Sequence, residues 1–181
     1  MTRPCLFGAL VLAAASAAGC DTSEKKAAPQ RPGAGTDADA APASAMATVF
    51  LRSRLEGRRA IVDVIARNAE RDVHGAAFRL AWAPERLGLV EARLSAAWSG
   101  SALRLAKEGL PGELVVVWSE KAESTGVPAR DETILGTIEL TVKGTGPVDV
   151  TFRPERSTLR DATGASIPVE WHGGEVAAPR E

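Results

Sequence analysis

The chain has 181 residues, of which 45% are hydrophobic and 25% are charged, and its formal net charge at pH 7 is -1. This length suits one ordinary domain with appendages. Because 22 Lys and Arg residues nearly balance 23 Asp and Glu residues, the chain has no overall positive charge to attract nucleic acid. Two cysteines cannot form a disulfide-rich scaffold, and two histidines far apart make a zinc site hard to assemble. We therefore expect no nucleic-acid partner, no metal site and no cofactor.

The first twenty residues have the pattern of a secretory signal. Arg3 precedes an apolar segment over residues 6–18, which is too short to span a membrane as a helix of the mature protein. Small residues then lead to Cys20, and this stretch resembles the lipobox of bacterial lipoproteins, although Ala17 stands where the usual pattern has Leu. The resemblance implies a signal peptide over residues 1–19, lipidation of Cys20 and a domain anchored outside the cytoplasm in the cell envelope. The alternative is ordinary cleavage nearby, which leaves Cys20 as a free thiol.

Residues 20–46 form the next segment, which is rich in Ala, Pro and Gly. From residue 21 to residue 45 it contains no Val, Ile, Leu or aromatic side chain, so it cannot bury a core. This composition is typical of a disordered linker. Its expected reach of about 25 to 30 Å would hold a domain clear of lipid headgroups. We assign residues 47–178 to the domain and residues 179–181 to a tail.

Short segments of alternating apolar and polar residues, separated by Gly, Pro, Asn and Asp, fill the domain. This pattern is typical of strands and turns. The segments lie at residues 48–55, 60–67, 73–82, 87–94, 113–119, 133–142 and 148–152, followed by a hairpin that turns at residues 161–164 and a last strand at 175–177. Residues 102–109 are assigned to a loop with room for one helical turn. Without sustained helical periodicity, the sequence predicts an all-β, jelly-roll-type β-sandwich of about nine strands.

Two of the predicted strands place tryptophans on a buried face. Trp82 has the same phase as Phe78 and Leu80, and Trp118 has the same phase as Leu114 and Val116. We expect both tryptophans to belong to the core.

The run GAAFRLAWAPERLGLV, which begins at Gly75, resembles the cohesin signature of a Gly before a Phe-x-Leu-x-aromatic strand that ends at a Pro. Later segments are similar in order, namely LGTIELTVKGTGPVDVTF and the closing DATGASIPVEWHGGEV. Ala83 stands where the family often has Asp between the aromatic residue and the proline, so the chain resembles a divergent member. The resemblance covers about residues 47–178.

This resemblance implies a non-catalytic binding module with a relatively flat sheet face, and the expected lipid on Cys20 would anchor that module to a membrane. Cohesins use such a face to dock dockerins, so a dockerin-like protein is the expected partner. Related sandwiches include carbohydrate-binding modules, which makes a polysaccharide-binding lipoprotein the alternative.

The face opposite Phe78, Leu80 and Trp82 is the expected docking surface. Small side chains around one Arg allow close approach, and Arg often anchors interfaces. The neighbouring strand at residues 113–119 is apolar on both faces, and an exposed apolar stripe often marks an interface. The predicted contact residues are Ala77, Arg79, Ala81, Val115 and Val117. The alternative for the two valines is that a loop or another strand covers them.

Trp98 is the candidate for carbohydrate binding, because an exposed indole can stack on a sugar ring. It lies among small residues in a predicted loop, where it could equally cover the end of the sandwich.

The sequence contains no catalytic motif with the spacing that its chemistry needs. A polar cluster that includes Ser119 and Glu120 follows one strand, and we expect it to be a solvated loop. An envelope hydrolase would require the fold to bring distant carboxylates together.

Overall fold

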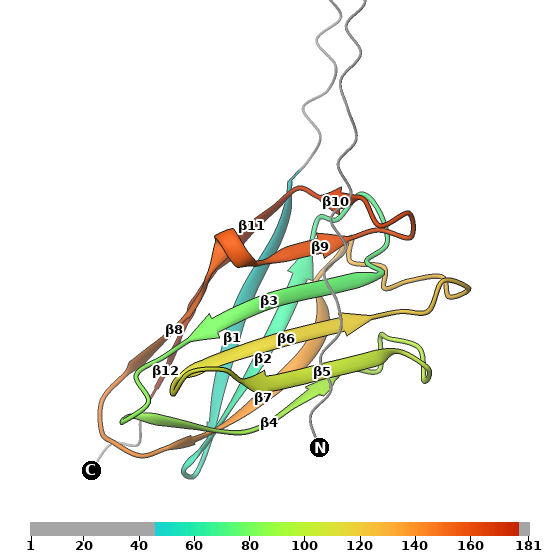
Figure 1. The fold of residues 1–181 in the computed structure, drawn as a ribbon. Coiled ribbons are helices and arrows are strands. Elements are labelled where there is room, and N and C mark those ends of the chain that lie inside the picture. Colours follow the sequence, from blue (N-terminus) through green and yellow to red (C-terminus); the bar gives the residue numbers. More distant parts are fainter. Residues whose placement is uncertain (1–45, 178–181) are drawn as a thin grey trace, which may run out of the picture. The chain divides into compact units, whose positions relative to one another are not determined.

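The computed structural model describes residues 46–177, which form a sandwich of two β-sheets (Figure 1). These residues contain twelve strands and one short 3₁₀ turn. The predicted all-β sandwich is confirmed, although it has more strands than the nine or so expected. No helix within residues 46–177 has the length and apolar character needed to span a membrane.

The first sheet has the strand order β11-β1-β2-β7-β4. Strands β1 and β11 run parallel, whereas the other neighbours in this sheet run antiparallel. The central strand β2 is rich in Val and Ile and is buried on both faces, as suits β-branched residues in the middle of a sheet. The strands are β1 (Ala47–Glu56), β2 (Arg59–Arg67), β4 (Leu87–Leu94), β7 (Thr133–Val142) and β11 (Val169–His172).

The second sheet has the order β10-β9-β3-β6-β5, and β8 joins it by pairing with β3. Strand β8 also pairs with β12 (Gly174–Val176), and the 3₁₀ turn η1 (Pro154–Arg156) follows β8 directly. The remaining strands are β3 (Gly75–Ala81), β5 (Leu103–Glu108), β6 (Glu113–Ser119), β8 (Val148–Phe152), β9 (Thr158–Arg160) and β10 (Ser166–Ile167).

The core lies between the sheets and is built on aromatic side chains of the second sheet. Phe78 and Trp118 are both buried, and their rings meet edge to face with centroids 5.2 Å apart. The ring of Phe152 also meets Phe78 edge to face, with centroids 5.7 Å apart. Trp82 is also buried, and its indole donates a hydrogen bond to the carbonyl of Leu87 at 3.3 Å. The predicted core positions of Trp82 and Trp118 are therefore confirmed.

Strand β5 corrects the assignment of residues 102–109 to a loop. It pairs along its whole length with β6, from Leu103 opposite Ser119 to Glu108 opposite Leu114. All six of its residues are exposed, because β5 lies at the edge of its sheet and has no buried face. The short segment RLAK also favours helix as much as strand by composition. Pairing with β6 therefore makes β5 a strand, and its own sequence pattern does not.

The predicted hairpin at residues 161–164 joins β9 to β10 and is confirmed. One carboxylate oxygen of Asp161 accepts hydrogen bonds from the Thr163 hydroxyl at 2.7 Å, the Thr163 amide at 2.9 Å and the Ala165 amide at 3.0 Å. The other oxygen pairs with Arg71. The Thr163 hydroxyl above all, together with Arg71 and the two amides, outweighs burial and lowers the pKa of Asp161 to about 2. Asp161 is thus the structural acceptor of this turn.

Candidate partner-binding face

The outer surface of the second sheet contains all five predicted contact residues. In the pairing of β3 with β6, Ala77 lies opposite Val117 and Arg79 lies opposite Val115. Burial alternates along both strands, so Phe78 and Leu80 point into the core while these residues point outward. Ala81 completes the outward set on β3. The structure therefore brings the predicted residues together on one surface.

The apolar part of this surface extends onto β5. Leu105 lies opposite Val117 in the strand pairing, so Leu105, Val117 and Ala77 form one row across three strands. The exposed fractions are 57% for Leu105 and 40% for Val117. Leu103, on the same side of β5, is 63% exposed. Val117 is therefore not covered by another described segment, whereas Val115 is half-buried.

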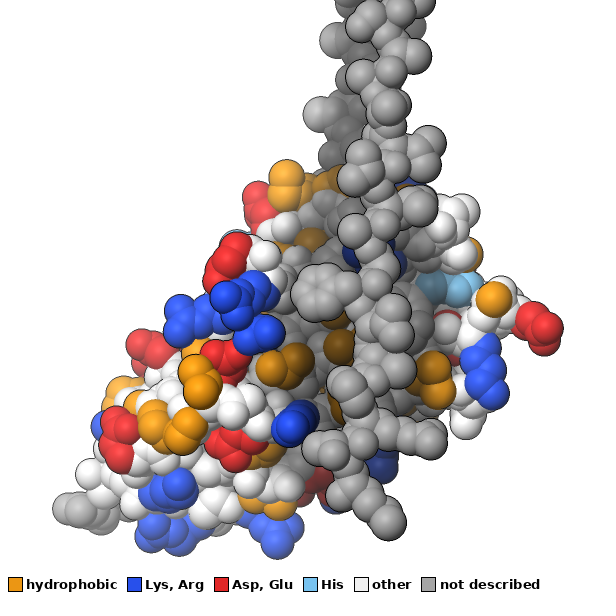
Figure 2. Space-filling view, in the orientation of Figure 1, with side chains coloured by type: hydrophobic (Ala, Val, Ile, Leu, Met, Phe, Trp, Pro, Cys, Tyr) orange, Lys and Arg blue, Asp and Glu red, His pale blue; other side chains and the backbone are white. Residues whose placement is uncertain are grey.

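We call this surface, made by the outward residues of β3, β5 and β6, the docking face. Figure 2 shows hydrophobic side chains next to a group of Lys and Arg side chains on the side of the molecule that carries these strands. Sequence reasoning missed Leu103 and Leu105. Their spacing of two residues was the available signal, because it places both on one side of a strand.

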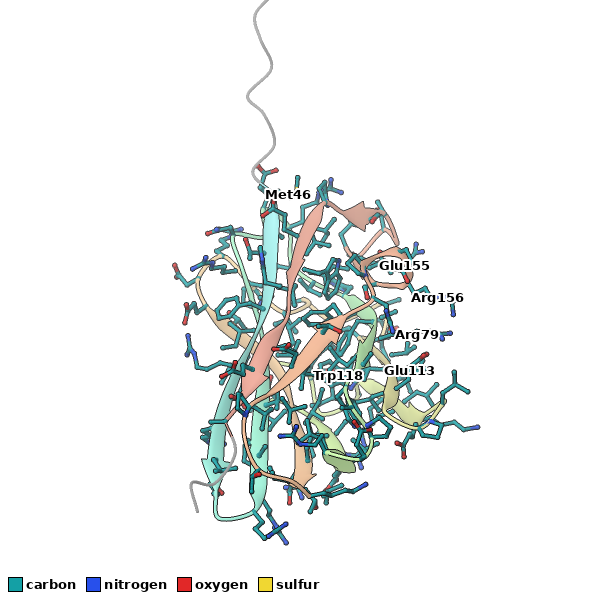
Figure 3. All side chains as sticks on the ribbon, turned by 90° about the vertical axis from the view of Figure 1, so that its left-hand side faces the viewer. Met46, Arg79, Glu113, Trp118, Glu155 and Arg156 are labelled. Carbon is teal, nitrogen blue, oxygen red and sulfur yellow. The ribbon has the colours of Figure 1, made fainter. Side chains whose placement is uncertain are left out.

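The docking face contains one internal ion pair. Arg79 donates a hydrogen bond to Glu113 at 2.6 Å. The side chain of Arg79 is 32% exposed and that of Glu113 is 18% exposed. The two residues come from neighbouring strands, and Figure 3 shows them on the same side of the sandwich. This pair fixes the guanidinium of Arg79 against the sheet, so its position is set before any partner arrives.

The outer surface of the first sheet differs in character. Its arginines pair with carboxylates of the same surface, so most of its charge is satisfied internally. The pairs are Arg54 with Asp63 at 2.7 Å, Arg59 with Glu139 at 3.0 Å and Arg93 with Glu91 at 2.6 Å. The strands of this sheet expose two large apolar residues, Val90 and Ile134, whereas β5, β6 and the turn between them expose four, namely Leu103, Leu105, Leu110 and Val117. Of the two sheet surfaces, the docking face is therefore the better candidate for an interface.

The expectation that Trp98 is an exposed sugar-stacking residue is wrong. Only 5% of Trp98 is exposed, and its indole nitrogen donates a hydrogen bond to the Leu135 carbonyl at 2.6 Å. Its ring contacts Trp118 with centroids 6.4 Å apart. Trp98 therefore covers the end of the core, which was the other interpretation of its position.

The expected solvated loop after β6 is also corrected at Glu120, which is buried. Its carboxylate accepts hydrogen bonds from the Ser99 amide at 2.6 Å and the Ser99 hydroxyl at 2.5 Å. Burial alone raises the pKa of Glu120, but the two bonds from Ser99 outweigh it and bring the pKa below its usual value. Glu120 therefore fastens the loop that contains Trp98.

The amino-acid sequence matches no family model and no curated protein. Solved structures do match the fold. The sixth cohesin of scaffoldin B from Acetivibrio cellulolyticus, solved in complex with a dockerin, has a TM-score of 0.64 at 15% identity, covering 74% of this chain and 99% of that one. A cohesin module of a family 33 glycoside hydrolase from Clostridium perfringens has a TM-score of 0.62 at 15% identity, covering 76% of this chain and 99% of that one.

A non-cellulosomal cohesin from the archaeon Archaeoglobus fulgidus also matches, with a TM-score of 0.58 at 17% identity over 73% of this chain and 90% of that one. These identities are low, so the likeness is one of fold. It agrees with the two-sheet sandwich of residues 46–177. Residues 46–177 form a cohesin-like β-sandwich domain.

Proposed function

We propose that this domain is a non-catalytic module that docks a protein of the dockerin kind through the docking face. The observation that carries the proposal is the exposed row of Leu105, Val117 and Ala77 beside the fixed guanidinium of Arg79. Such a surface combines apolar area for burial with an arginine for orientation. The matching cohesins that were solved in complex with dockerins support a partner of the same kind.

We propose further that lipid on Cys20 anchors the domain to a membrane of the bacterial envelope. The proposal rests on the apolar segment and small residues before Cys20, which lie outside the described residues. Each buried methylene of an acyl chain contributes about 0.8 kcal/mol, so two or more chains hold a protein stably at a membrane. A single tethered module would then act as a receptor for a partner at the cell envelope.

Site-specific photo-crosslinking in the source bacterium tests the docking proposal. A photoreactive phenylalanine analogue replaces Leu105 on the docking face or Ile134 on the outer surface of the first sheet. Both positions are exposed apolar strand residues, and Ile134 is 41% exposed. We expect one discrete protein adduct from position 105, identified by mass spectrometry, and none of that adduct from position 134. Equal adducts from both positions would contradict the proposed face.

A further inference from the structure

A pocket of about 320 Å³ lies at one end of the docking face, where β3 and β6 meet η1. Three of its six lining residues are arginines from two separate elements. The pocket is lined by Arg79, Leu110, Glu113, Arg153, Glu155 and Arg156. Figure 3 shows Arg79 between Arg156 and Glu113 on one side of the sandwich, with Glu155 beside Arg156.

Backbone and hydroxyl hydrogen bonds fix η1 against β3. The amide of Arg153 donates to the carbonyl of Arg79 at 2.9 Å. The hydroxyl of Ser157 donates to the carbonyl of Arg153 at 2.7 Å and accepts a bond from the amide of Arg79 at 3.4 Å. Pro154, at the start of η1, restricts the backbone further. The backbone that carries Arg153 and Arg156 is therefore held in place before binding, which lowers the entropy cost of an interface.

The charges around the pocket do not balance. Arg79 is paired with Glu113. Within residues 46–177, the side chains of Arg153, Arg156 and Glu155 are exposed and form no hydrogen bond or ion pair. Two guanidinium groups thus face solvent with one carboxylate near them, and each guanidinium has five donors in a planar fork that suits a carboxylate.

The geometry points to an acidic anchor on the partner. This inference rests on the proposed docking function. A Glu or Asp side chain of the docked protein sits in the pocket and accepts hydrogen bonds from Arg153 and Arg156, while apolar side chains of the same protein cover Val117 and Leu105. Arg79 lies two residues from Ala77 on β3, a separation of about 7 Å, so one short segment of the partner reaches both regions.

An apolar wall favours a protein segment over a bare phosphate group. Leu110 lines the pocket and is 67% exposed, and the row of Leu105 and Val117 continues the apolar area on the same sheet surface. A lipid headgroup or a nucleic-acid phosphate has no apolar group that would pack against these side chains. A peptide offers both a carboxylate and aliphatic groups at suitable spacing.

A selection experiment with a defined probe tests the inference. The purified full chain is the target for a phage-displayed library of two-helix miniproteins with one randomised surface. The selected clones are sequenced and then titrated against four variants of the full chain. These are the double variant Arg153→Gln with Arg156→Gln, the variant Glu155→Gln, the variant Val117→Glu, and Arg130→Gln as the control for an exposed arginine elsewhere on the domain.

We expect enriched clones to carry at least one invariant Asp or Glu next to Leu or Ile. Their affinity should fall about tenfold for the double arginine variant, rise two- to fivefold or so for Glu155→Gln, and stay unchanged for Arg130→Gln. The rise in affinity for Glu155→Gln is the diagnostic result, because removal of this negative charge strengthens the binding of a negatively charged ligand only.

Clones that depend on Val117 but have no acidic residue would overturn the acidic anchor and leave the docking function standing. If no clone depends on Val117, both the docking function and the anchor are contradicted. Vesicles of phosphatidylglycerol form a separate arm with the same variants. Binding of these vesicles that is lost in the double arginine variant, without acidic clones, would replace the protein anchor by a phosphate site.

Discussion

The indole of Trp118 on β6 lies against the backbone of Gly136 on β7, so the two sheets pack together there at a residue without a side chain. A Cβ atom at position 136 would lie 2.7 Å from Cζ2 of Trp118 and nearer still to Cη2. Trp118 is fully buried and also contacts the rings of Phe78 and Trp98. The separation of the sheets at this point is therefore set by one glycine and one tryptophan.

Gly136→Ala should destabilise the domain by about 1 to 3 kcal/mol, because the added methyl group forces the indole or the backbone to move. Urea unfolding followed by tryptophan fluorescence measures this change. Gly100→Ala is the matched control, since a Cβ atom at position 100 meets nothing within 4 Å. Equal stability of the two variants would mean that the sheets have room to separate.

The turn at Asp161 should make stability depend on acid pH. The pKa of Asp161 in the folded domain is about 2, below its ordinary value of 3.8, so its charged form stabilises the fold above about pH 4. That contribution is lost as the pH falls from about 4 to about 2. Asp161→Asn should therefore lower the thermal midpoint by a few degrees at pH 6, and its difference from the wild type should shrink towards pH 2.

Thermal melts of the wild type and Asp161→Asn across this pH range measure the effect. Asp149→Asn, at an exposed position on β8, provides the control for the loss of one carboxylate. A constant difference between Asp161→Asn and the wild type down to pH 2 would show that the turn does not depend on the ionised carboxylate.

Trp98→Ala should lower the free energy of unfolding of the domain. Truncation of a buried tryptophan costs about 3 to 5 kcal/mol, and the Leu135 carbonyl also loses one of its two donors and keeps the Ser95 amide. Trp98→Phe keeps most of the volume and should cost less, since about 1 kcal/mol is typical for one hydrogen bond. Chemical denaturation gives both values. A variant Trp98→Ala as stable as the wild type would show that the indole does not cover the core.

The parts of the fold that sequence predicted well are strands with one buried face. In β3 the alternation of Phe78 and Leu80 with Ala77 and Arg79 fixes both the strand and its orientation. Strand β5 has no such alternation in burial, and only its pairing with β6 identifies it as a strand. The sequence therefore predicted neither β5 nor the outward position of Leu105.

Tertiary contacts also decide the positions that sequence could not place. Trp98 was ambiguous because its partner, the Leu135 carbonyl on β7, lies 37 residues further along the chain. No pattern in the sequence marks Arg153 and Arg156 as binding residues. They reach the docking face because the amide of Arg153 pairs with β3 and so brings η1 there.

Cys20→Ser should release the protein from the membrane. The wild-type chain should partition into detergent and yield an N-terminal peptide whose Cys20 carries diacylglycerol, whereas the variant should remain in the aqueous phase. Phase separation with a mild detergent followed by mass spectrometry of the N-terminal peptide measures both. An unmodified thiol at Cys20 in the wild type would contradict the anchor and leave the docking face unaffected.

We propose that the outward surface of β3, β5 and β6 binds the partner. The most direct measurement is the affinity of the crosslinked partner, once purified, for Val117→Glu and for Ile134→Glu. The two residues are 40% and 41% exposed β-branched strand residues on opposite sheets. We expect Val117→Glu to weaken binding by about ten- to a hundredfold, or about 1.4 to 2.8 kcal/mol, and Ile134→Glu to leave it within about twofold. Unchanged affinity for a folded Val117→Glu variant would contradict the claim.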